Sequence, residues 1–474
     1  MASRRALADL SSAGTRKRRR WQVANICFAA FLALALIGVA PFQEWVMPAR
    51  TGSGDIANQI LYLGIFLFLL LGSGPLVTRR QLLPLPLSIA LLLAYCLISV
   101  LWALDPAISL RRLILAAVVI WVIFRCVGDL GYARTLLIAE YALIALLLVN
   151  YLLVFLTDYG VHPAVPGEES SIVGNWRGIL PHKNIAGATC AFTVLFMLFD
   201  ATRIPKYLRA LTIVAALVFL YFTQSKTSEA VLVAAIAAGL LIRPYHASYR
   251  TFAAVGALIM AIIAVQLLSV YSEALRTIIN DPTALTGRAS IWPLLLDYAG
   301  DHLWTGAGFG SFWQIGEASP IWALTHGWVA QYASHGHNGY LDLLVTIGLP
   351  GLVLAVIALL VWPLARLLLS LSITRGQRSL LLALFVFCAC HNLTESSLMN
   401  GASTVQIFFV MTIALIYYLS SAGSGAHQPL RRRALRILRL DRSRTLRSGR
   451  VAMTMPAQAS YRPIRKERDA HPPG

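Results

Sequence analysis

The chain has 474 residues, of which 58% are hydrophobic and only 13% are charged. Soluble globular domains carry about 25% charged residues, so this composition excludes an ordinary soluble enzyme and indicates a membrane protein. The formal net charge of +19 does not indicate nucleic-acid binding, because thirteen of the 40 Lys and Arg residues follow the last apolar segment and seven precede the first.

Apolar runs recur along the whole chain, and each is long enough to cross a bilayer core of about 30 Å. None has the period-two alternation of a membrane barrel. We therefore predict an all-α integral membrane protein with about twelve transmembrane helices, in which the helices satisfy the backbone amides. The expected spans are 21–43, 58–76, 82–103, 109–127, 135–157, 184–200, 207–222, 229–243, 251–270, 337–365, 378–393 and 402–420.

The basic residues predict the orientation of these spans. With the basic N-terminus inside, the inside connections and tails carry 32 Lys and Arg residues and the outside connections carry 8, as the positive-inside rule requires. Both termini are then cytoplasmic, and anionic lipid head groups are the expected partners of the flanks. The first span could be a signal peptide, but its long basic leader favours an uncleaved anchor.

The same reading divides the chain into three parts. Residues 1–20 form a basic cytoplasmic N-terminus, 21–420 form the membrane domain, and 421–474 form a basic, largely disordered cytoplasmic tail. Within the membrane domain, Leu349-Pro350-Gly351 predicts a kink in the tenth span. The six Cys lie in apolar segments without a CxxC pattern, so we interpret them as buried small hydrophobic residues.

The largest outside loop, 271–336, carries a first candidate site residue, Arg288. An amphipathic helix is expected over 288–299, followed by a turn at Gly306-Ala-Gly-Phe-Gly310. At the start of that helix, a guanidinium and free amides suit phosphate oxygens. The alternative is an interfacial Arg that binds a lipid head group, and position alone favours this alternative.

A second group of cations lies in the other large outside loop, 158–183. Arg177, His182 and Lys183 stand just before a span, and three cations close together suit an anion. They could also simply flank a helix, although an outward-facing basic cluster runs against the usual bias. Lys226, in a short outside loop, could join this anion site or flank the helix end.

His337 is the best candidate for a catalytic base. It begins the stretch His337-Asn-Gly-Tyr-Leu341 at the mouth of the tenth span, and imidazole can accept a proton from a hydroxyl at neutral pH. A lone His is more often structural, so the context has to decide. Asn338 could orient a substrate or cap the span. The Trp residues of the two large loops are read mainly as an aromatic belt, and stacking on sugars is the sharper alternative.

Three segments together resemble the bacterial O-antigen ligase and exopolysaccharide polymerase superfamily. They are Leu285-Thr-Gly-Arg-Ala-Ser-Ile-Trp292, Gly306-Ala-Gly-Phe-Gly-Ser-Phe-Trp313 and, most specifically, His337-Asn-Gly-Tyr-Leu-Asp-Leu-Leu-Val-Thr-Ile-Gly-Leu-Pro-Gly351. Trp176-Arg-Gly, His182-Lys-Asn184 and Gln224-Ser-Lys226 are similar to the exopolysaccharide production polymerase branch. The resemblance covers roughly 58–420, with the ligase-like region at about 212–360. It departs at Lys226, where the family commonly has Arg.

The resemblance implies a GT-C-like glycosyltransferase of the bacterial inner membrane with one large periplasmic loop. Its donor would be a glycan on undecaprenyl pyrophosphate, and its acceptor a glycan or a lipid-linked acceptor. His337 would deprotonate or orient the acceptor hydroxyl, while Arg177 and Arg288 would hold the pyrophosphate. No metal or other cofactor is expected, because cations would neutralise the leaving group, and no HExxH, DxD-like or Walker motif occurs. A chain-length regulator and export proteins are the expected protein partners.

Polymerisation of exopolysaccharide repeat units is the leading hypothesis, and ligation of a glycan onto a lipid A core or another acceptor is the runner-up. A polysaccharide or lipid transporter is a distant alternative. It would predict charged residues within the spans and repeated halves, whereas here the charges crowd the outside loops.

Overall fold

The computed structural model describes residues 2–38, 56–73, 83–163, 172–249, 290–325, 333–401 and 403–421. Within these ranges the protein is helical, and the only β pairing is an isolated antiparallel bridge between Val161 and Trp176. The expected span 251–270, Arg288 and the predicted tail lie outside the described residues.

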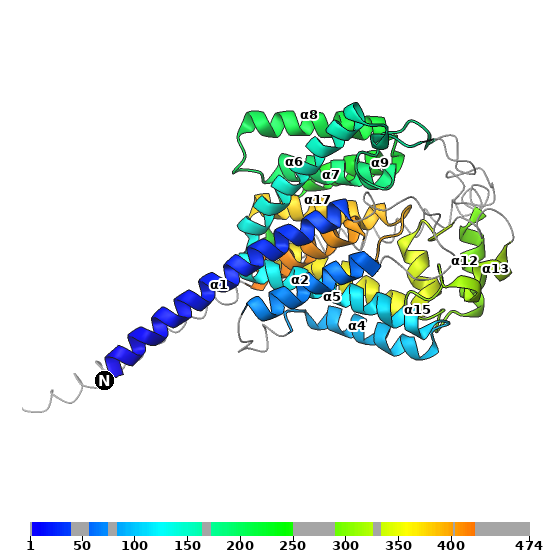
Figure 1. Cartoon of the computed structure of the whole chain (residues 1–474), viewed down its shortest axis with the longest axis horizontal. Coiled ribbons are helices and arrows are strands. Elements are labelled where there is room, and N and C mark those ends of the chain that lie inside the picture. Colours follow the sequence, from blue (N-terminus) through cyan, green and yellow to red (C-terminus); the bar gives the residue numbers. More distant parts are fainter. Residues whose placement is uncertain are drawn as a thin grey trace, which may run out of the picture. The chain divides into compact units, whose positions relative to one another are not determined.

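The helices follow the apolar segments closely (Figure 1). Those of the first half are α1 (Ala2–Ile37), α2 (Ile56–Gly72), α4 (Leu87–Ser99), α5 (Pro106–Leu130), α6 (Tyr132–Leu156), α7 (Lys183–Phe199), α8 (Lys206–Thr223) and α9 (Lys226–Leu241). Those of the second half are α12 (Trp292–Asp301), α13 (Ile321–Leu324), α15 (Gly339–Val356), α16 (Trp362–Leu369) and α17 (Arg375–His391). A last helix covers Thr404–Ser421.

Six of the described helical segments are long and apolar enough to cross a membrane. They are Lys17–Ile37, Pro106–Leu130, Tyr132–Leu156, Lys206–Thr223, Gly339–Leu369 and Thr404–Ser421. Shorter apolar helices cover Ile56–Gly72, Leu87–Trp102 and Lys183–Phe199. Every expected span within the described residues therefore coincides with a helix, while the number that cross the bilayer stays a prediction.

Local sequence signals explain where several helices begin and end. The carboxylate of Asp105 accepts the N–H of Ile108, and Pro106 occupies the first turn of α5, which is the favoured place for proline. At the other end, Gly131 adopts a φ of 74° between α5 and α6. Thr374 and Gln377 form a reciprocal capping box at the start of α17. The chain thus reverses direction where residues suited to helix ends occur.

The expected kink in the tenth span is confirmed and lies at Gly348. This residue has φ 65° and ψ −178°, a non-helical conformation that divides α15 two residues before Pro350. A proline cannot donate to the preceding turn, and glycine tolerates the positive φ. The helix then passes through a π-helical turn, Ile357–Val361, into α16.

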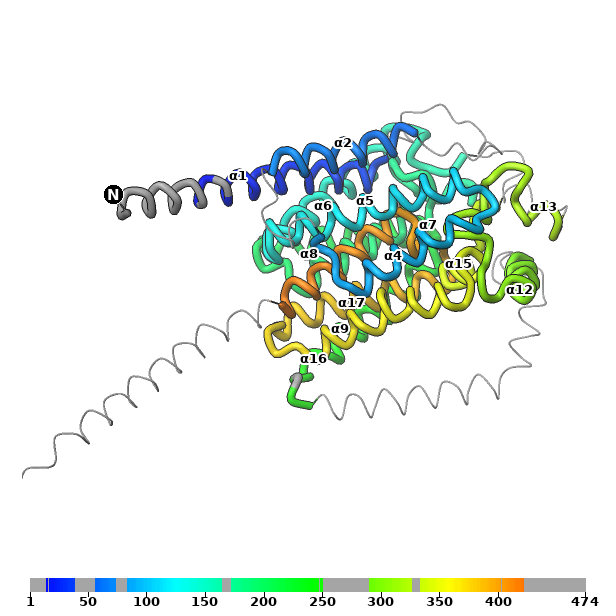
Figure 2. The backbone as a smooth tube through the Cα atoms, turned by 90° about the horizontal axis from the view of Figure 1, so that it is seen from below, coloured from blue at the N-terminus to red at the C-terminus, as the bar shows by residue number. Residues whose placement is uncertain are grey.

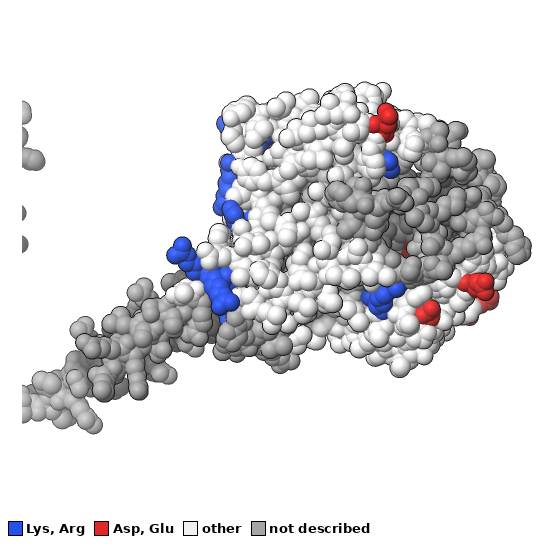
Figure 3. Space-filling view, viewed as in Figure 1, with Lys and Arg blue, Asp and Glu red and all other residues white. Residues whose placement is uncertain are grey.

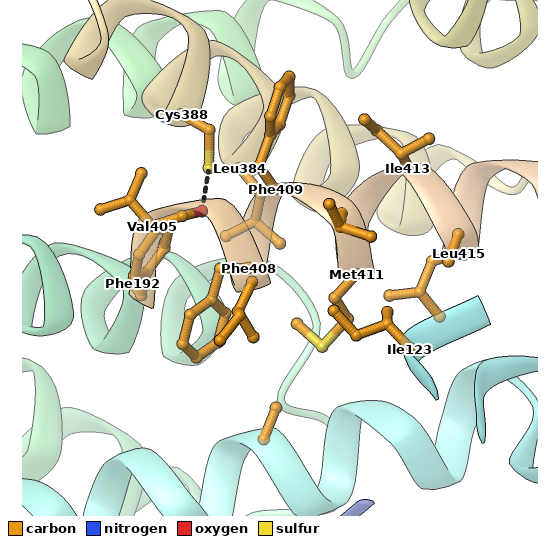
Figure 4. Packing of buried hydrophobic residues seen from close by; sticks show 14 of the residues in the cluster. Ile123, Phe192, Leu384, Cys388, Val405, Phe408, Phe409, Met411, Ile413 and Leu415 are labelled. Atoms are coloured by element: carbon orange, nitrogen blue, oxygen red, sulfur yellow. Dashed lines mark hydrogen bonds between the residues drawn. The ribbon is translucent and has the colours of Figure 1, made fainter. Parts of the chain in front are cut away.

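The core lies where α7, α17 and the last helix meet (Figure 4). The ring of Phe192 stacks on Phe408 with centroids 4.5 Å apart and meets the edge of Phe387 at 5.0 Å. The thiol of Cys388 donates to the carbonyl oxygen of Val405 at 3.9 Å. Cys390 is half-buried and the other five Cys are buried without disulfides, as expected for small hydrophobic residues.

Basic residues gather at one end of the helices (Figure 3). The last turns of α5 and the first turns of α6, α8 and α17 lie at this end, as does the segment just after α9. The basic residues there include Arg125, Arg134, Arg209, Arg243 and Arg375. The opposite ends of α5, α7, α9 and α15 form the other pole. α12 packs against α15 there (Figure 2), so this helix of the large loop lies at the same pole.

Candidate functional site

His337 lies in the connection that leads into α15, and its backbone is in the left-handed region. Its φ is 49°, a conformation that costs a non-glycine residue of order 1–3 kcal/mol unless its surroundings impose it. The preceding Gly336 donates its N–H to both carboxylate oxygens of Asp342, at 3.0 and 3.1 Å. The following Asn338 donates its N–H to the hydroxyl of Ser396 at 3.0 Å. His337 is therefore held from both sides.

Glu395 faces the imidazole of His337. Its Oε2 lies 3.3 Å from Nδ1 of His337, and its Oε1 accepts a hydrogen bond of 2.7 Å from Nδ2 of Asn184. The side chain of Glu395 is 11% exposed and that of His337 is 31% exposed. An ionised carboxylate can only accept, so a neutral imidazole in this contact would carry its hydrogen on Nδ1 and keep Nε2 as the proton acceptor.

Asn392 shapes the loop that carries Glu395. Its Oδ1 accepts the N–H groups of Ser397 and Leu398 at 2.8 and 3.0 Å. The N–H of Gly339 donates to the carbonyl oxygens of Asn392 and Glu395, at 2.9 and 3.1 Å. A Cβ on Gly339 would lie 2.4 Å from Oδ1 of Asn392. Only glycine therefore allows the start of α15 to dock on this loop, and that docking places His337 beside Glu395.

The sequence analysis missed Glu395 as a site residue. The available signal is its position, because it is an acidic residue in the short connection directly after an apolar span. Intramembrane and juxtamembrane carboxylates are costly and tend to have partners. What the sequence alone does not supply is the partner, since His337 is 58 residues away in the chain.

Asn338 caps α15, which was one of its two predicted roles. Its Oδ1 accepts the N–H groups of Tyr340 and Leu341, at 3.0 and 3.1 Å. The side-chain oxygen is thus engaged at the helix N-terminus, in the usual manner of an N-cap residue. This contact directs the chain from His337 into the span.

Two adjoining cavities lie beside Glu395 and His335, and His337 itself is not among the residues that line them. The first, of about 370 Å³, is lined in part by Asn184, His335 and Glu395. The second, of about 320 Å³, is lined in part by Arg111, Arg112 and Asp342. Both are lined by Asn58, His335, Ser396 and Asn400. We name them the glutamate cavity and the arginine cavity. The ring centroid of His335 lies 4.2 Å from that of His337.

Arg112 fixes the glycine-rich turn at the wall of the arginine cavity. Its guanidinium donates to the carbonyl oxygens of Gly310, Trp313 and Gln314, the last two at 2.8 and 3.2 Å. Gly308 has a φ of 87°, and a Cβ there would lie 2.4 Å from Cα of Ala103. The turn expected at 306–310 is confirmed, and its glycines allow it to pack against the end of α4.

Arg177 is buried in the loop before α7. Its guanidinium lies over the ring of Tyr159 at 4.5 Å, and its Nε donates to the carbonyl oxygen of the same residue at 3.1 Å. It is 9% exposed. Arg177 is not among the residues that line the glutamate or arginine cavity. Its guanidinium instead packs on Tyr159.

His162 is a second residue that the sequence analysis missed. Its Nε2 accepts the N–H of Lys183 at 3.0 Å, and its ring meets that of His182 at a centroid distance of 5.3 Å. Burial, followed by the positive field of His182, Arg177 and Lys183, lowers the pKa of His162 to about 4. The predicted cations are therefore close enough to share one electrostatic environment.

His182 and Lys183 begin α7. Nδ1 of His182 accepts the N–H of Asn184 at 3.2 Å and so caps the helix. Asn184 in turn reaches Glu395. The loop that carries the cations is thereby joined to the His337–Glu395 pair through one turn of α7.

Lys226, at the start of α9, is exposed and forms an ion pair with Glu229. Its side chain is 73% exposed and its Nζ lies 3.3 Å from Oε2 of Glu229. The neighbouring Thr227 accepts a hydrogen bond of 3.1 Å from Thr394, next to Glu395. Lys226 therefore stands at the rim of the same pole. Arg288 lies outside the described residues.

Across the described part of the chain, no three His, Cys, Asp or Glu side chains gather in a way that could hold a metal ion. The chemistry available at this pole is that of an imidazole, a carboxylate and nearby cations. An imidazole with a free Nε2 can accept a proton, and the cations can balance an anionic group.

The comparisons with known proteins agree with the motifs. The family model described as O-Antigen ligase matches residues 211–356, a stretch that begins in α8 and ends with α15 and includes His337. No curated protein matches the chain. The resemblance that the sequence indicated is confirmed over residues 211–356, where the chain is similar to the O-antigen ligase family.

Proposed function

We propose that the protein polymerises undecaprenyl-pyrophosphate-linked repeat units of an exopolysaccharide. It would act at the periplasmic face of the bacterial inner membrane, with both termini in the cytoplasm. The family match supports glycosyl transfer from a lipid-linked donor. The concentration of basic residues at the opposite pole from His337 supports this orientation (Figure 3).

The observation that carries the proposal is the contact between His337 and Glu395 beside two cavities. Glu395 keeps the hydrogen on Nδ1, so Nε2 of His337 accepts the proton of the acceptor hydroxyl. The oxygen then attacks the anomeric carbon, and the bond from that carbon to the pyrophosphate oxygen breaks. The leaving pyrophosphate takes the electron pair, and the imidazolium is stabilised by the carboxylate of Glu395.

The cations supply the charge that balances the leaving group. We assign the pyrophosphate to Arg177, His182, Lys183 and Lys226 from the described residues, together with Arg288 by the resemblance. Donors fixed in advance at a site of developing negative charge lower the barrier. This assignment makes the reaction independent of a metal ion. Asn338 contributes by capping α15 and so orienting His337.

The second candidate is ligation of the glycan onto a lipid A core or another acceptor, which the description of the matching family favours. Both reactions use the same donor and the same base, and they differ in the acceptor hydroxyl. Under polymerisation the acceptor is a second lipid-linked glycan, and a chain-length regulator and export proteins are the partners.

The test is complementation of a null strain. Wild-type protein, His337→Ala and His246→Ala are compared at equal membrane levels, because His246 is exposed in the connection after α9. Loss of polymer with accumulation of single lipid-linked repeats in His337→Ala alone supports polymerisation. Normal polymer from His337→Ala contradicts the proposed mechanism. Intact polymer that is no longer attached to its lipid acceptor favours ligation.

A further inference from the structure

An apolar groove of about 470 Å³ lies between α1 and α6, away from the two cavities of the candidate site. Figure 1 shows α1 lying against α6. Ala29, Ala33 and Ala145 line the groove and are exposed. Since both helices are long and apolar enough to cross a membrane, the groove opens toward the bilayer.

Small side chains leave this space open. Ala29 and Ala33 of α1 face Ala142 and Ala145 of α6. Small residues between membrane helices usually let the two backbones approach closely. Here α1 and α6 are in contact, and a groove of about 470 Å³ still remains between them. The rest of the lining is aliphatic apart from Tyr141, Asn25 and Arg134, and Leu137 and Val149 mark its apolar extent along α6.

The two ends of the groove differ. At one end Arg134 donates from Nε to Oδ1 of Asn25 at 2.6 Å, and its guanidinium lies 5.5 Å from the ring of Trp21. At the other end, Leu36 and Ile37 line both the groove and the glutamate cavity. The groove therefore runs from the Arg134–Asn25 hydrogen bond at one end to the glutamate cavity at the other.

We propose that this groove holds the polyprenyl chain of the lipid-linked donor, which enters the groove at the end shared with the glutamate cavity. This inference rests on the proposed function. The stretch from Leu137 to Val149 is about 18 Å long at 1.5 Å per residue, so it accommodates a chain of several isoprene units. Apolar burial along this length holds the chain.

The ends of the groove distinguish this occupant from a bilayer phospholipid. A phospholipid keeps its head group at the membrane surface, outside the helices. The groove is closed by Arg134 and Asn25 at one end and leads into a polar cavity at the other. This geometry suits a lipid whose head group enters the protein while its chain extends along α6.

The test compares two neighbouring alanines of α1. Ala29 and Ala30 are both exposed, but only Ala29 lines the groove. Binding of undecaprenyl pyrophosphate and of inorganic pyrophosphate is measured with purified full-length wild type, Ala29→Phe and Ala30→Phe. Ala142→Phe, on the facing helix, repeats the test should Ala29→Phe not fold.

Ala29→Phe is expected to weaken binding of undecaprenyl pyrophosphate by about tenfold, because it displaces buried chain methylenes. Inorganic pyrophosphate should bind all three proteins equally, since it has no chain to enter the groove. Equal binding of undecaprenyl pyrophosphate to Ala29→Phe and wild type overturns the proposal. Loss of co-purified phospholipid from Ala29→Phe, with its affinity for undecaprenyl pyrophosphate unchanged, also overturns the proposal. Wild-type protein that binds neither pyrophosphate overturns the proposed function and the groove assignment with it.

Discussion

Nδ1 of His337 lies 3.3 Å from Oε2 of Glu395, although the two residues are 58 positions apart in the chain. The other oxygen of Glu395 is engaged by Asn184 at the start of α7. Three helix ends therefore meet at one carboxylate, and this carboxylate sets which nitrogen of the imidazole is available.

Glu395→Gln tests this orientation directly. The amide oxygen can still accept from Asn184, but the amide NH₂ would face Nδ1 of His337 and favour the tautomer with hydrogen on Nε2. The base is then blocked, and transfer should fall by about 10²–10⁴-fold, in kcat rather than KM. Initial rates of purified protein measure the effect. Glu317→Gln, at an exposed position of the large loop before α15, should retain wild-type rates, and an active Glu395→Gln would refute the orienting role.

The low pKa of His162 predicts acid sensitivity of the fold. Burial and the neighbouring cations lower its pKa from the ordinary value for histidine to about 4. Below about 6.5 the unfolded chain binds a proton that the folded protein does not, so stability falls as the pH drops toward about 4. His162→Gln retains an acceptor for the N–H of Lys183 without this titration. Its thermal midpoint should vary less between pH 7.5 and about 4.5 than that of wild type, and parallel curves would contradict the prediction.

Gly308 and Gly300 offer a matched pair for the glycine-rich turn. A Cβ at Gly308 would meet Cα and Cβ of Ala103 at 2.4 Å with φ at +87°, whereas one at Gly300 meets nothing within 4 Å. Gly308→Ala should destabilise the protein by about 2 kcal/mol or more, from overpacking and backbone strain. Gly300→Ala, in α12, should be neutral or slightly stabilising. Thermal unfolding of the two variants in detergent checks the difference, and equal midpoints would argue against the close packing.

Much of the fold follows from local patterns. The apolar runs locate the helices, and Pro350 predicts the break that the structure has at Gly348. Asn338 and the glycine-rich turn were also recognisable, because capping and positive φ are properties of short segments. The close approach of Gly308 to Ala103 depends on how α4 packs, and no spacing in the sequence reveals it.

The candidate site was predicted only in part for the same reason. His337 has a strong local motif, whereas Glu395 acquires its role by facing a distant residue. His162 is likewise a single His in a loop, and its low pKa arises from cations that folding brings near. Lys226 was expected either to join the anion site of Arg177 or to flank a helix end. In the structure Arg177 is buried on Tyr159, and Lys226 is exposed beside Glu229 at the start of α9.

Variants at Lys226 test donor binding without changing the stability of the protein. An exposed ion pair such as Lys226–Glu229 contributes about 0–1 kcal/mol, so Lys226→Ala should unfold at the wild-type temperature. If Lys226 contacts the pyrophosphate, KM for the donor rises severalfold in Lys226→Ala and recovers in Lys226→Arg, which keeps the charge. Unchanged kinetics in Lys226→Ala would remove this residue from the anion site.

The central claim is that His337 is the base for glycosyl transfer. Purified full-length wild-type protein and His337→Ala are supplied with lipid-linked repeat units, and polymer and released undecaprenyl pyrophosphate are measured together. The account predicts both products from wild type and neither from a His337→Ala protein with the same thermal midpoint. Polymer and pyrophosphate at wild-type rates from His337→Ala would contradict it.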